Sequence, residues 1–223
     1  ELMSKEELEE LIKLPMGYGY TKGSPLLRKR ISNLYKDCSE DNILVTSGSS
    51  EAILLTALLT VSDTDKVVMM TPNYLSFNGI AESLGAVVDY VPLLKEDSWR
   101  WDIDYLKEVV VDETKVISIC NPNNPTGSVL TVAEMEKIVE IAETFDVFIH
   151  SDEVYIGAEL SNQQTVSFQN IYQKTIVTSG LSKSYSHPGL RIGWIAANED
   201  LVREAWEIKD YTTIASSNLS QHI

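Results

Sequence analysis

The chain has 223 residues, of which 43% are hydrophobic and 23% charged, a composition that is ordinary for a globular protein with one domain or at most two small ones. Its 33 acidic residues outnumber 18 basic ones, and the formal net charge of -15 argues against nucleic acid or a membrane surface as a partner, so any bound anion needs a local site. No apolar run approaches a membrane span, the first residues are acidic, and the two cysteines and three histidines lack metal-ligand spacing, so we expect a cytoplasmic protein without a metal site.

The first half of the chain alternates helical and extended patterns. An acidic helix is expected over 1–14 and ends at Pro15, and a glycine-punctuated loop follows over 17–25. Apolar spacing and short apolar runs then predict a helix over 26–35, a strand over 43–46, a helix from 52 to about 61, a strand over 66–71, a helix that carries Ile80, Ala81 and Leu84, and a strand over 85–91.

The second half continues the alternation. The patterns predict a helix from 102 to about 110, a strand over 115–120, a helix from 132 to about 144, a strand over 147–150, a polar loop over 157–172, strands over 174–178 and 190–196, and a helix over 199–211. The last residues, 215–223, resemble the start of another helix. Such alternation is typical of βαβ units, so we expect an α/β fold of three layers, α/β/α, around a mainly parallel, mixed sheet.

Two stretches carry candidate ligand groups. Ser47-Gly-Ser-Ser-Glu51 joins a strand to a helix, and backbone N–H groups at such a helix start bind anions, although a serine N-cap would explain the same residues. In the stretch 178–193, Lys183 lies among small residues and Arg191 follows eight positions later. A lysine in a partly desolvated site forms Schiff bases with carbonyl cofactors and an arginine binds phosphate, whereas the alternative is a Ser/Gly-rich turn with incidental basic residues.

Four motifs follow strands in a set order. They are Ser47-Gly-Ser-Ser-Glu-Ala, Asn121-Pro-Asn-Asn-Pro-Thr-Gly, Asp152-Glu-Val-Tyr155, and Ser182-Lys183 followed by Arg191 and Gly193. In open α/β sheets ligands bind beyond the carboxyl ends of the strands, where these motifs are expected. The set resembles the class I/II aminotransferases, which are fold-type-I pyridoxal-phosphate enzymes of the aspartate aminotransferase superfamily, and the resemblance extends from about Tyr18 to Trp194.

The resemblance implies a catalytic role for three side chains. Lys183 would form the Schiff base with the aldehyde of pyridoxal 5'-phosphate and then move a proton between the substrate and the cofactor, which requires an amine pKa below its free value. Asp152 would pair with the pyridine nitrogen. Tyr155, together with Asn124, would hydrogen-bond the phenolic oxygen of the cofactor. Taken singly, Asp152 could cap a turn, Asn124 could be a turn residue, and Tyr155 could belong to the core.

The resemblance also implies the remaining cofactor contacts. Gly48, Ser49 and Ser50 match the phosphate-binding turn, and Arg191 matches the arginine that pairs with the phosphate, although an arginine by itself could form a surface ion pair. Tyr74 matches the aromatic residue that stacks on the pyridine ring, although a single tyrosine after a strand is often mere packing.

Tyr18 precedes Gly23 by five residues, as does the family tyrosine that reaches the phosphate of the neighbouring subunit. The resemblance therefore implies a homodimer with shared active sites. One departure is Gly180, three positions before Lys183, where relatives often have a serine that bonds the phosphate.

We expect an N-terminal helical segment over 1–16 and a cofactor-binding large domain over 17–223, in a chain truncated at both ends and without the small C-terminal domain that holds the substrate carboxylate. The expected activity is the transfer of an amino group from an amino acid to a 2-oxo acid through the Schiff base on Lys183. The alternatives are a C–S β-lyase on the same cofactor, which would also use Lys183, and a sensor domain that binds the cofactor without turning it over.

Overall fold

The computed structural model describes residues 4–160 and 164–223, and its centre is an eight-stranded sheet within these residues. The strands are β1 (Ile43–Thr46), β2 (Lys66–Thr71), β3 (Val87–Leu94), β4 (Arg100–Trp101), β5 (Thr114–Cys120), β6 (Phe148–Asp152), β7 (Thr175–Gly180) and β8 (Gly193–Ala196). The helices are α1 (Lys5–Ile12), α2 (Pro25–Ser32), α3 (Ser49–Thr60), α4 (Ser76–Ser83), α5 (Ile103–Val109), α6 (Val132–Thr144) and α7 (Glu199–Lys209).

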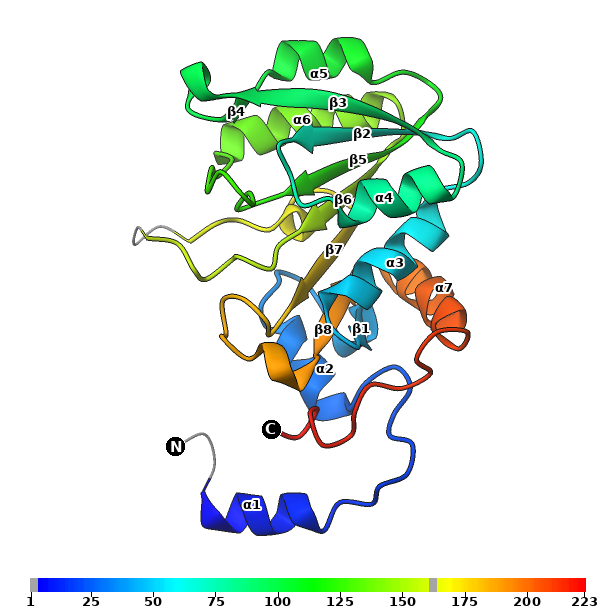
Figure 1. The fold of residues 1–223 in the computed structure, drawn as a ribbon, viewed down its shortest axis with the longest axis vertical. Coiled ribbons are helices and arrows are strands. Elements are labelled where there is room, and N and C mark those ends of the chain that lie inside the picture. The colour runs from blue at the N-terminus through cyan, green and yellow to red at the C-terminus, as the bar shows by residue number, and fades with distance from the viewer. Residues whose placement is uncertain (1–3, 161–163) are drawn as a thin grey trace.

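The sheet is mixed and mainly parallel, as predicted. Its order is β1-β8-β7-β6-β5-β2-β3-β4, and the five strands from β7 to β3 pair in parallel. Strand β8 runs antiparallel to both of its neighbours, β1 and β7, and β4 runs antiparallel to β3. The parallel strands point in one direction, toward the left of Figure 1. Because β8 runs the other way, its first residue lies at the edge where β1 and β7 end.

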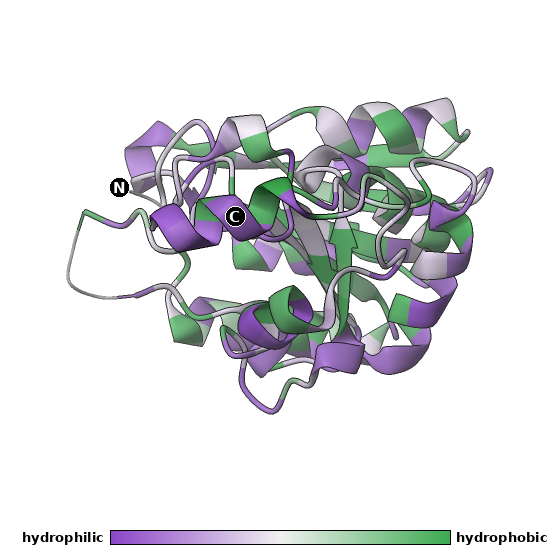
Figure 2. Cartoon of the chain, turned by 90° about the horizontal axis from the view of Figure 1, so that it is seen from below, coloured by the Kyte–Doolittle hydropathy of each residue, from purple (hydrophilic) through white to green (hydrophobic). Residues whose placement is uncertain are grey.

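Helices cover both faces of the sheet, which confirms the three-layer prediction. Helices α3, α4 and α7 pack on one face with residues such as Ile53, Phe77 and Val202, whereas α5, α6 and α2 pack on the other with residues such as Leu106 and Met135. Figure 2 shows the hydrophobic residues gathered along the strands and the hydrophilic ones on the outer sides of the helices. Helix α1 buries none of its residues and stands apart from these layers.

The expected start of a helix over 215–223 forms only a single turn, in which the Ser217 carbonyl accepts the Gln221 N–H at 3.1 Å and Oγ of Ser217 accepts the Ser220 N–H at 3.3 Å. Two other polar side chains of the segment bond to distant backbone. The Oε1 atom of Gln221 accepts the Ser24 N–H at 2.7 Å, and the Nδ2 atom of Asn218 donates to the Pro15 carbonyl at 3.3 Å. Among the described residues, none of the helices combines the length and apolar character needed to cross a membrane.

Candidate active site

The strand register brings the sequence motifs to one edge of the sheet. Thr46 at the end of β1 pairs with Gly193 at the start of β8, and Gly193 pairs in turn with Gly180 at the end of β7. Asp152 at the end of β6 lies between Cys120 and Thr178 of the neighbouring strands. The segments that follow these strand ends therefore share one region of space, as expected from the α/β architecture.

The turn between β1 and α3 leaves the start of a helix without a side-chain cap. Gly48 is the N-cap of α3, with a φ of 87°, and it supplies no side-chain cap. The serine N-cap considered for this turn is therefore not present. The first N–H groups of a helix, here those of Ser49 and Ser50, have no intrahelical acceptor and lie at the positive end of the helix dipole. These N–H groups are free to bind an anion at this position.

Arg191 closes the same turn from the β8 side. A Cβ atom on Gly48 would lie 2.3 Å from a terminal nitrogen of the Arg191 guanidinium, so the two residues are in direct contact. The Nη1 atom of Arg191 donates to the carbonyl of Pro188 at 3.0 Å and to Oγ of Ser182 at 3.4 Å. These bonds orient the guanidinium over the start of α3, where its planar fork can pair with a phosphate.

Two glycines allow this close approach. A Cβ on Gly193 would lie 2.3 Å from the carbonyl carbon of Gly48, and a Cβ on Gly180 would lie 2.9 Å from the carbonyl oxygen of Ile192. The Gly180 position, noted as a departure from the family pattern, is thus closed to a side chain by neighbouring backbone. The serine hydroxyl that contacts Arg191 belongs to Ser182 instead.

Asp152 is a buried carboxylate with few partners. Its side chain is 6% exposed, and its Oδ1 accepts one N–H, that of Val154, at 3.3 Å. Burial raises the pKa of Asp152 to about 7, although the Val154 N–H and the positive charge of Lys183 oppose the rise. Asp152 and Tyr74 line the same small hollow, and Tyr74 is half exposed at the end of β2. The predicted ring-stacking and nitrogen-binding side chains are therefore neighbours.

Lys183 and Tyr155 face each other in the turns that follow β7 and β6. The Nζ atom of Lys183 lies 5.9 Å from the centre of the Tyr155 ring. Tyr155 and Asn124 both line an open cavity of about 890 Å³ between the loop 122–132 and the segment after β6. The structure thus brings Lys183, Asp152 and Tyr155, the residues predicted for catalysis, into one region. Tyr18 is not among them.

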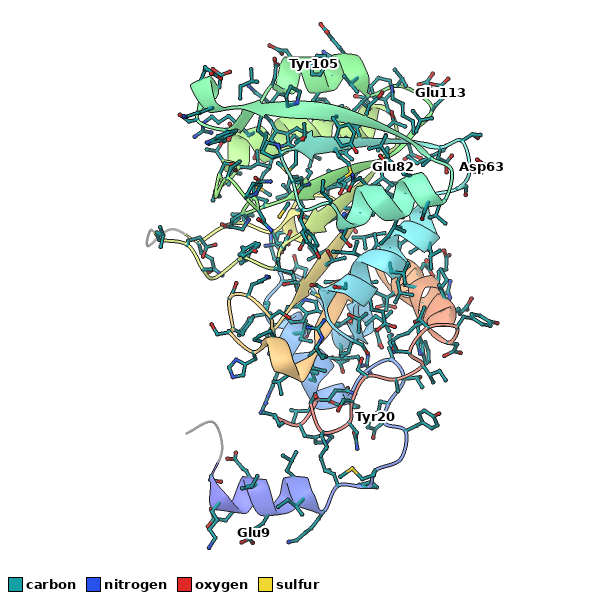
Figure 3. All side chains as sticks on the ribbon, viewed as in Figure 1. Glu9, Tyr20, Asp63, Glu82, Tyr105 and Glu113 are labelled. Atoms are coloured by element: carbon teal, nitrogen blue, oxygen red, sulfur yellow. The ribbon has the colours of Figure 1, made fainter. Side chains whose placement is uncertain are left out.

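Tyr18 lies in the extended segment between α1 and α2 and is 84% exposed. The nearby Tyr20, labelled in Figure 3, belongs to the same segment, below the body of the domain. The structure contains a single chain, so the assignment of Tyr18 to the site of a partner subunit stays a prediction.

The sequence analysis did not single out His150, which lies directly beneath the site. Its two ring nitrogens contact Oγ of Ser118 at 2.8 Å and Oγ1 of Thr178 at 3.0 Å, and its ring stacks on Phe77 with the centroids 4.4 Å apart. Burial lowers the pKa of His150 to about 3, so the ring is neutral. The two-residue period of a strand places His150 on the same face as Asp152, and that pattern could have identified it.

Part of the negative charge of the chain lies away from this edge of the sheet. Asp63, Glu82 and Glu113, labelled in Figure 3, lie on the right of the view, beside the starts of the parallel strands, whereas the strands end on the left. Exposed charges at such a separation are largely screened by salt. Such distant carboxylates therefore add little at the site, whereas the Arg191 guanidinium and the N-terminus of α3 are local.

Known proteins are similar to this chain in sequence and in fold. The family model described as aminotransferase class I and II matches residues 4–223. An aspartate aminotransferase of Musicola paradisiaca (strain Ech703) is 30% identical over 204 residues, which cover 87% of this chain and 51% of that protein. A probable aspartate aminotransferase of Methanocaldococcus jannaschii is 30% identical over 216 residues, which cover 92% and 57%.

Solved structures agree with the sequence comparison. A PLP-dependent aminotransferase from Streptococcus suis 89-1591 superposes with a TM-score of 0.93 at 35% identity and covers 97% of this chain and 57% of that one. An aromatic aminotransferase from Pyrococcus horikoshii OT3 gives a TM-score of 0.90 at 27% identity, with 98% and 61% covered. The chain thus spans little more than half the length of the relatives it matches. From the matched length and the shared fold, the chain belongs to the class I and II aminotransferase family.

Proposed function

We propose that this chain binds pyridoxal 5'-phosphate and that the protein transfers an amino group from an amino acid to a 2-oxo acid. The observation that carries the proposal is the contact between Gly48 and Arg191 at the start of α3, at the same sheet edge as Lys183 and the buried Asp152. An anion site, an amine and a buried acid in one region match a phosphorylated, aldehyde-bearing heterocycle.

The residues present fit the cofactor at both ends. The glycines at positions 48, 180 and 193 let the Arg191 guanidinium and the start of α3 approach each other closely, so that both could contact one phosphate. At the other end, Asp152 accepts one long hydrogen bond and has a raised pKa, so a protonated ring nitrogen would supply the cationic donor that this carboxylate lacks. Tyr74, which lines the hollow beside Asp152, would stack on the ring between them.

The cofactor, when bound, supplies a conjugated ring that accepts electrons from the α-carbon of the substrate. In that arrangement Nζ of Lys183 would move a proton between the substrate α-carbon and the cofactor. Asp152 would keep the ring nitrogen protonated. Tyr155 and Asn124, which line one cavity, donate hydrogen bonds to the phenolic oxygen.

The substrates and the assembly form part of the proposal. Relatives are named aspartate aminotransferase and aromatic-amino-acid aminotransferase, which supports a 2-amino acid as donor and a 2-oxo acid as acceptor. We propose a homodimer in which Tyr18, exposed on the segment before α2, reaches the phosphate of the neighbouring subunit. The cytoplasmic location expected from the sequence stays a prediction.

An absorbance titration with pyridoxal 5'-phosphate tests the proposal. We expect the wild type to develop the absorbance band of a Schiff base when the cofactor is added in stoichiometric amount, and Lys183→Ala to lack both this band and measurable amino transfer. Lys174→Ala is the matched control, because Lys174 precedes β7 at the opposite edge of the sheet and should leave both signals unchanged. A Lys183→Ala protein that transfers amino groups at the wild-type rate would contradict the assignment.

A panel of 2-oxo acids separates the proposed activity from its alternatives. A transferase consumes a 2-oxo acid for every amino acid converted. Release of pyruvate and a thiol without any acceptor would indicate a C–S β-lyase instead. A protein that binds the cofactor and converts none of the amino acids would correspond to the sensor.

A further inference from the structure

The carboxylate of Glu51 supports the anion-binding turn from behind. Glu51 lies in the first turn of α3 and is 7% exposed. Its Oε2 accepts the N–H of Ser47 at 2.6 Å, while its Oε1 accepts the hydroxyls of Thr212 and Thr213 at 2.6 and 2.7 Å. One side chain thus joins the turn after β1 to the turn after α7, which lies 161 or more positions further along the chain.

A buried lysine balances this carboxylate. Lys209 is fully buried, and its Nζ donates to Oγ1 of Thr213 at 3.1 Å and to the carbonyl of Ile214 at 2.9 Å. The Thr213 hydroxyl therefore accepts from Lys209 and donates to Glu51. Burial raises the pKa of Glu51, but the Ser47 N–H, the two threonine hydroxyls and the charge of Lys209 outweigh it and hold that pKa below its ordinary value.

The arrangement differs from an ordinary helix cap. In α6 the side chain of Glu134 returns to the N–H of its own N-cap, Thr131, in a reciprocal capping box. Glu51 takes the N–H of Ser47, one residue before the N-cap Gly48, and Gly48 has no side chain to occupy the helix start. Glu51 holds the residue before the N-cap and is itself bonded to the turn after α7, so no side chain caps the first-turn N–H groups of α3.

We propose that Glu51 is a positioning residue that holds this turn in the shape that binds the cofactor phosphate, and that the 209–216 turn is its anchor. It acts through the Ser47 N–H and does not touch the ligand. A carboxylate this close to a phosphate site would repel the ligand. The positive charge of Lys209, which is linked to Glu51 through the Thr213 hydroxyl, offsets that negative charge. The inference rests on the proposed function, since it assigns the anion as a phosphate ester.

The test compares the affinities of the full chain for pyridoxal 5'-phosphate and for pyridoxal, which lacks the phosphate. Both aldehydes form the same bond with Lys183, so the dissociation constant for pyridoxal divided by that for pyridoxal 5'-phosphate reports the phosphate contact alone. Glu51→Ala removes a charged hydrogen-bond acceptor from the turn, and we expect it to lower this ratio about tenfold to hundredfold. Affinity for pyridoxal itself should change little.

Two further variants separate positioning from general stability. Thr213→Val removes the hydroxyl that links Lys209 to Glu51 and leaves Glu51 in place, so it should also lower the ratio. Glu134→Ala is the matched control, because it removes a first-turn glutamate with comparable capping bonds from the helix α6 on the other face of the sheet. It should lower the unfolding temperature and leave the ratio at its wild-type value.

Each outcome supports or contradicts the positioning role of Glu51. A wild-type ratio in both Glu51→Ala and Thr213→Val overturns the positioning role, and so does an equal fall in Glu134→Ala, which would mark the effect as general loosening. If the wild type itself binds pyridoxal as tightly as its phosphate ester, the proposed function fails and the inference falls with it. That failure is visible in the wild type and is therefore distinct from a failure confined to the variants.

Discussion

Replacing Asp152 by asparagine should stabilise the cofactor-free protein at alkaline pH while weakening cofactor binding. The pKa of Asp152 is raised from 3.8 in the unfolded chain to about 7 in the folded protein, chiefly by burial. Between these values the unfolded chain has lost the proton and the folded protein keeps it. Folding therefore becomes costlier as pH rises from about 4 to 7, and the full cost persists above the folded pKa.

The size of the effect follows from the same shift. Each pKa unit corresponds to about 1.4 kcal/mol, so the ionised Asp152 costs the cofactor-free fold at most about 4 kcal/mol. Asparagine keeps an oxygen for the Val154 N–H but buries an amide without an assigned acceptor, which costs about 1–3 kcal/mol. The expected net gain in unfolding free energy for Asp152→Asn at pH 8 is about 2 kcal/mol, and at pH 4.5 the gain disappears or reverses.

Urea unfolding of cofactor-free wild type and Asp152→Asn at pH 4.5 and 8 measures this difference. Asp41→Asn is a control without this pH dependence, because hydrogen bonds and charge from Lys22 and Arg28 lower the pKa of the exposed Asp41, so its carboxylate is ionised at both pH values and the variant should lose a similar, small amount of stability at each. A difference between Asp152→Asn and wild type that is the same at both pH values would refute the reasoning. In the presence of cofactor the order should invert, since asparagine cannot hold a protonated ring nitrogen.

Three further predictions concern the anion site and the assembly. Arg191→Lys replaces a planar fork by a point charge and should weaken binding of pyridoxal 5'-phosphate about tenfold or more, measured by titration, with little change for pyridoxal. Gly193→Ala drives a methyl group into the Gly48 backbone and should lower unfolding free energy by about 1–3 kcal/mol as well as phosphate affinity, and wild-type values for both would contradict the close approach. If Tyr18 serves a partner subunit, mixing Tyr18→Phe with Lys183→Ala chains should recover activity beyond the sum of the two, whereas a simple sum would argue for separate sites.

Much of the fold was readable because the local signals agree with the final packing. The predicted bounds of β1, β2 and α6 match the structure, since each is a short apolar run or a capped amphipathic pattern that also packs into the core. Strand β4 was missed because two residues that pair only with β3 leave no periodic signal. The helix start expected over 215–223 forms only one turn, and Asn218 and Gln221 bond there to the segment before α2, a contact that no local pattern encodes.

The direction of β8 is a feature of the site that could not be predicted from the sequence. Its apolar run predicts a strand, and a strand predicts nothing about its own orientation. Only the antiparallel pairing with β1 and β7 sets Gly193 beside Thr46 and brings Arg191 onto Gly48. The motif spacing led to the correct pair through resemblance, whereas the contact itself depends on three strands that lie far apart in the chain.

Glu51 illustrates the same limit for a group that acts indirectly. In the sequence, an acidic residue after two serines at a helix start is explained by the helix dipole or by a cap. Its partners Thr212 and Thr213 belong to an irregular turn, and Lys209, which balances it, lies at the end of the buried face of α7 that also carries Leu201 and Ala205. A carboxylate placed beside an anion site is costly unless such partners exist, so the lysine and the two hydroxyls are what allow α3 to carry a glutamate in its first turn and still receive a phosphate.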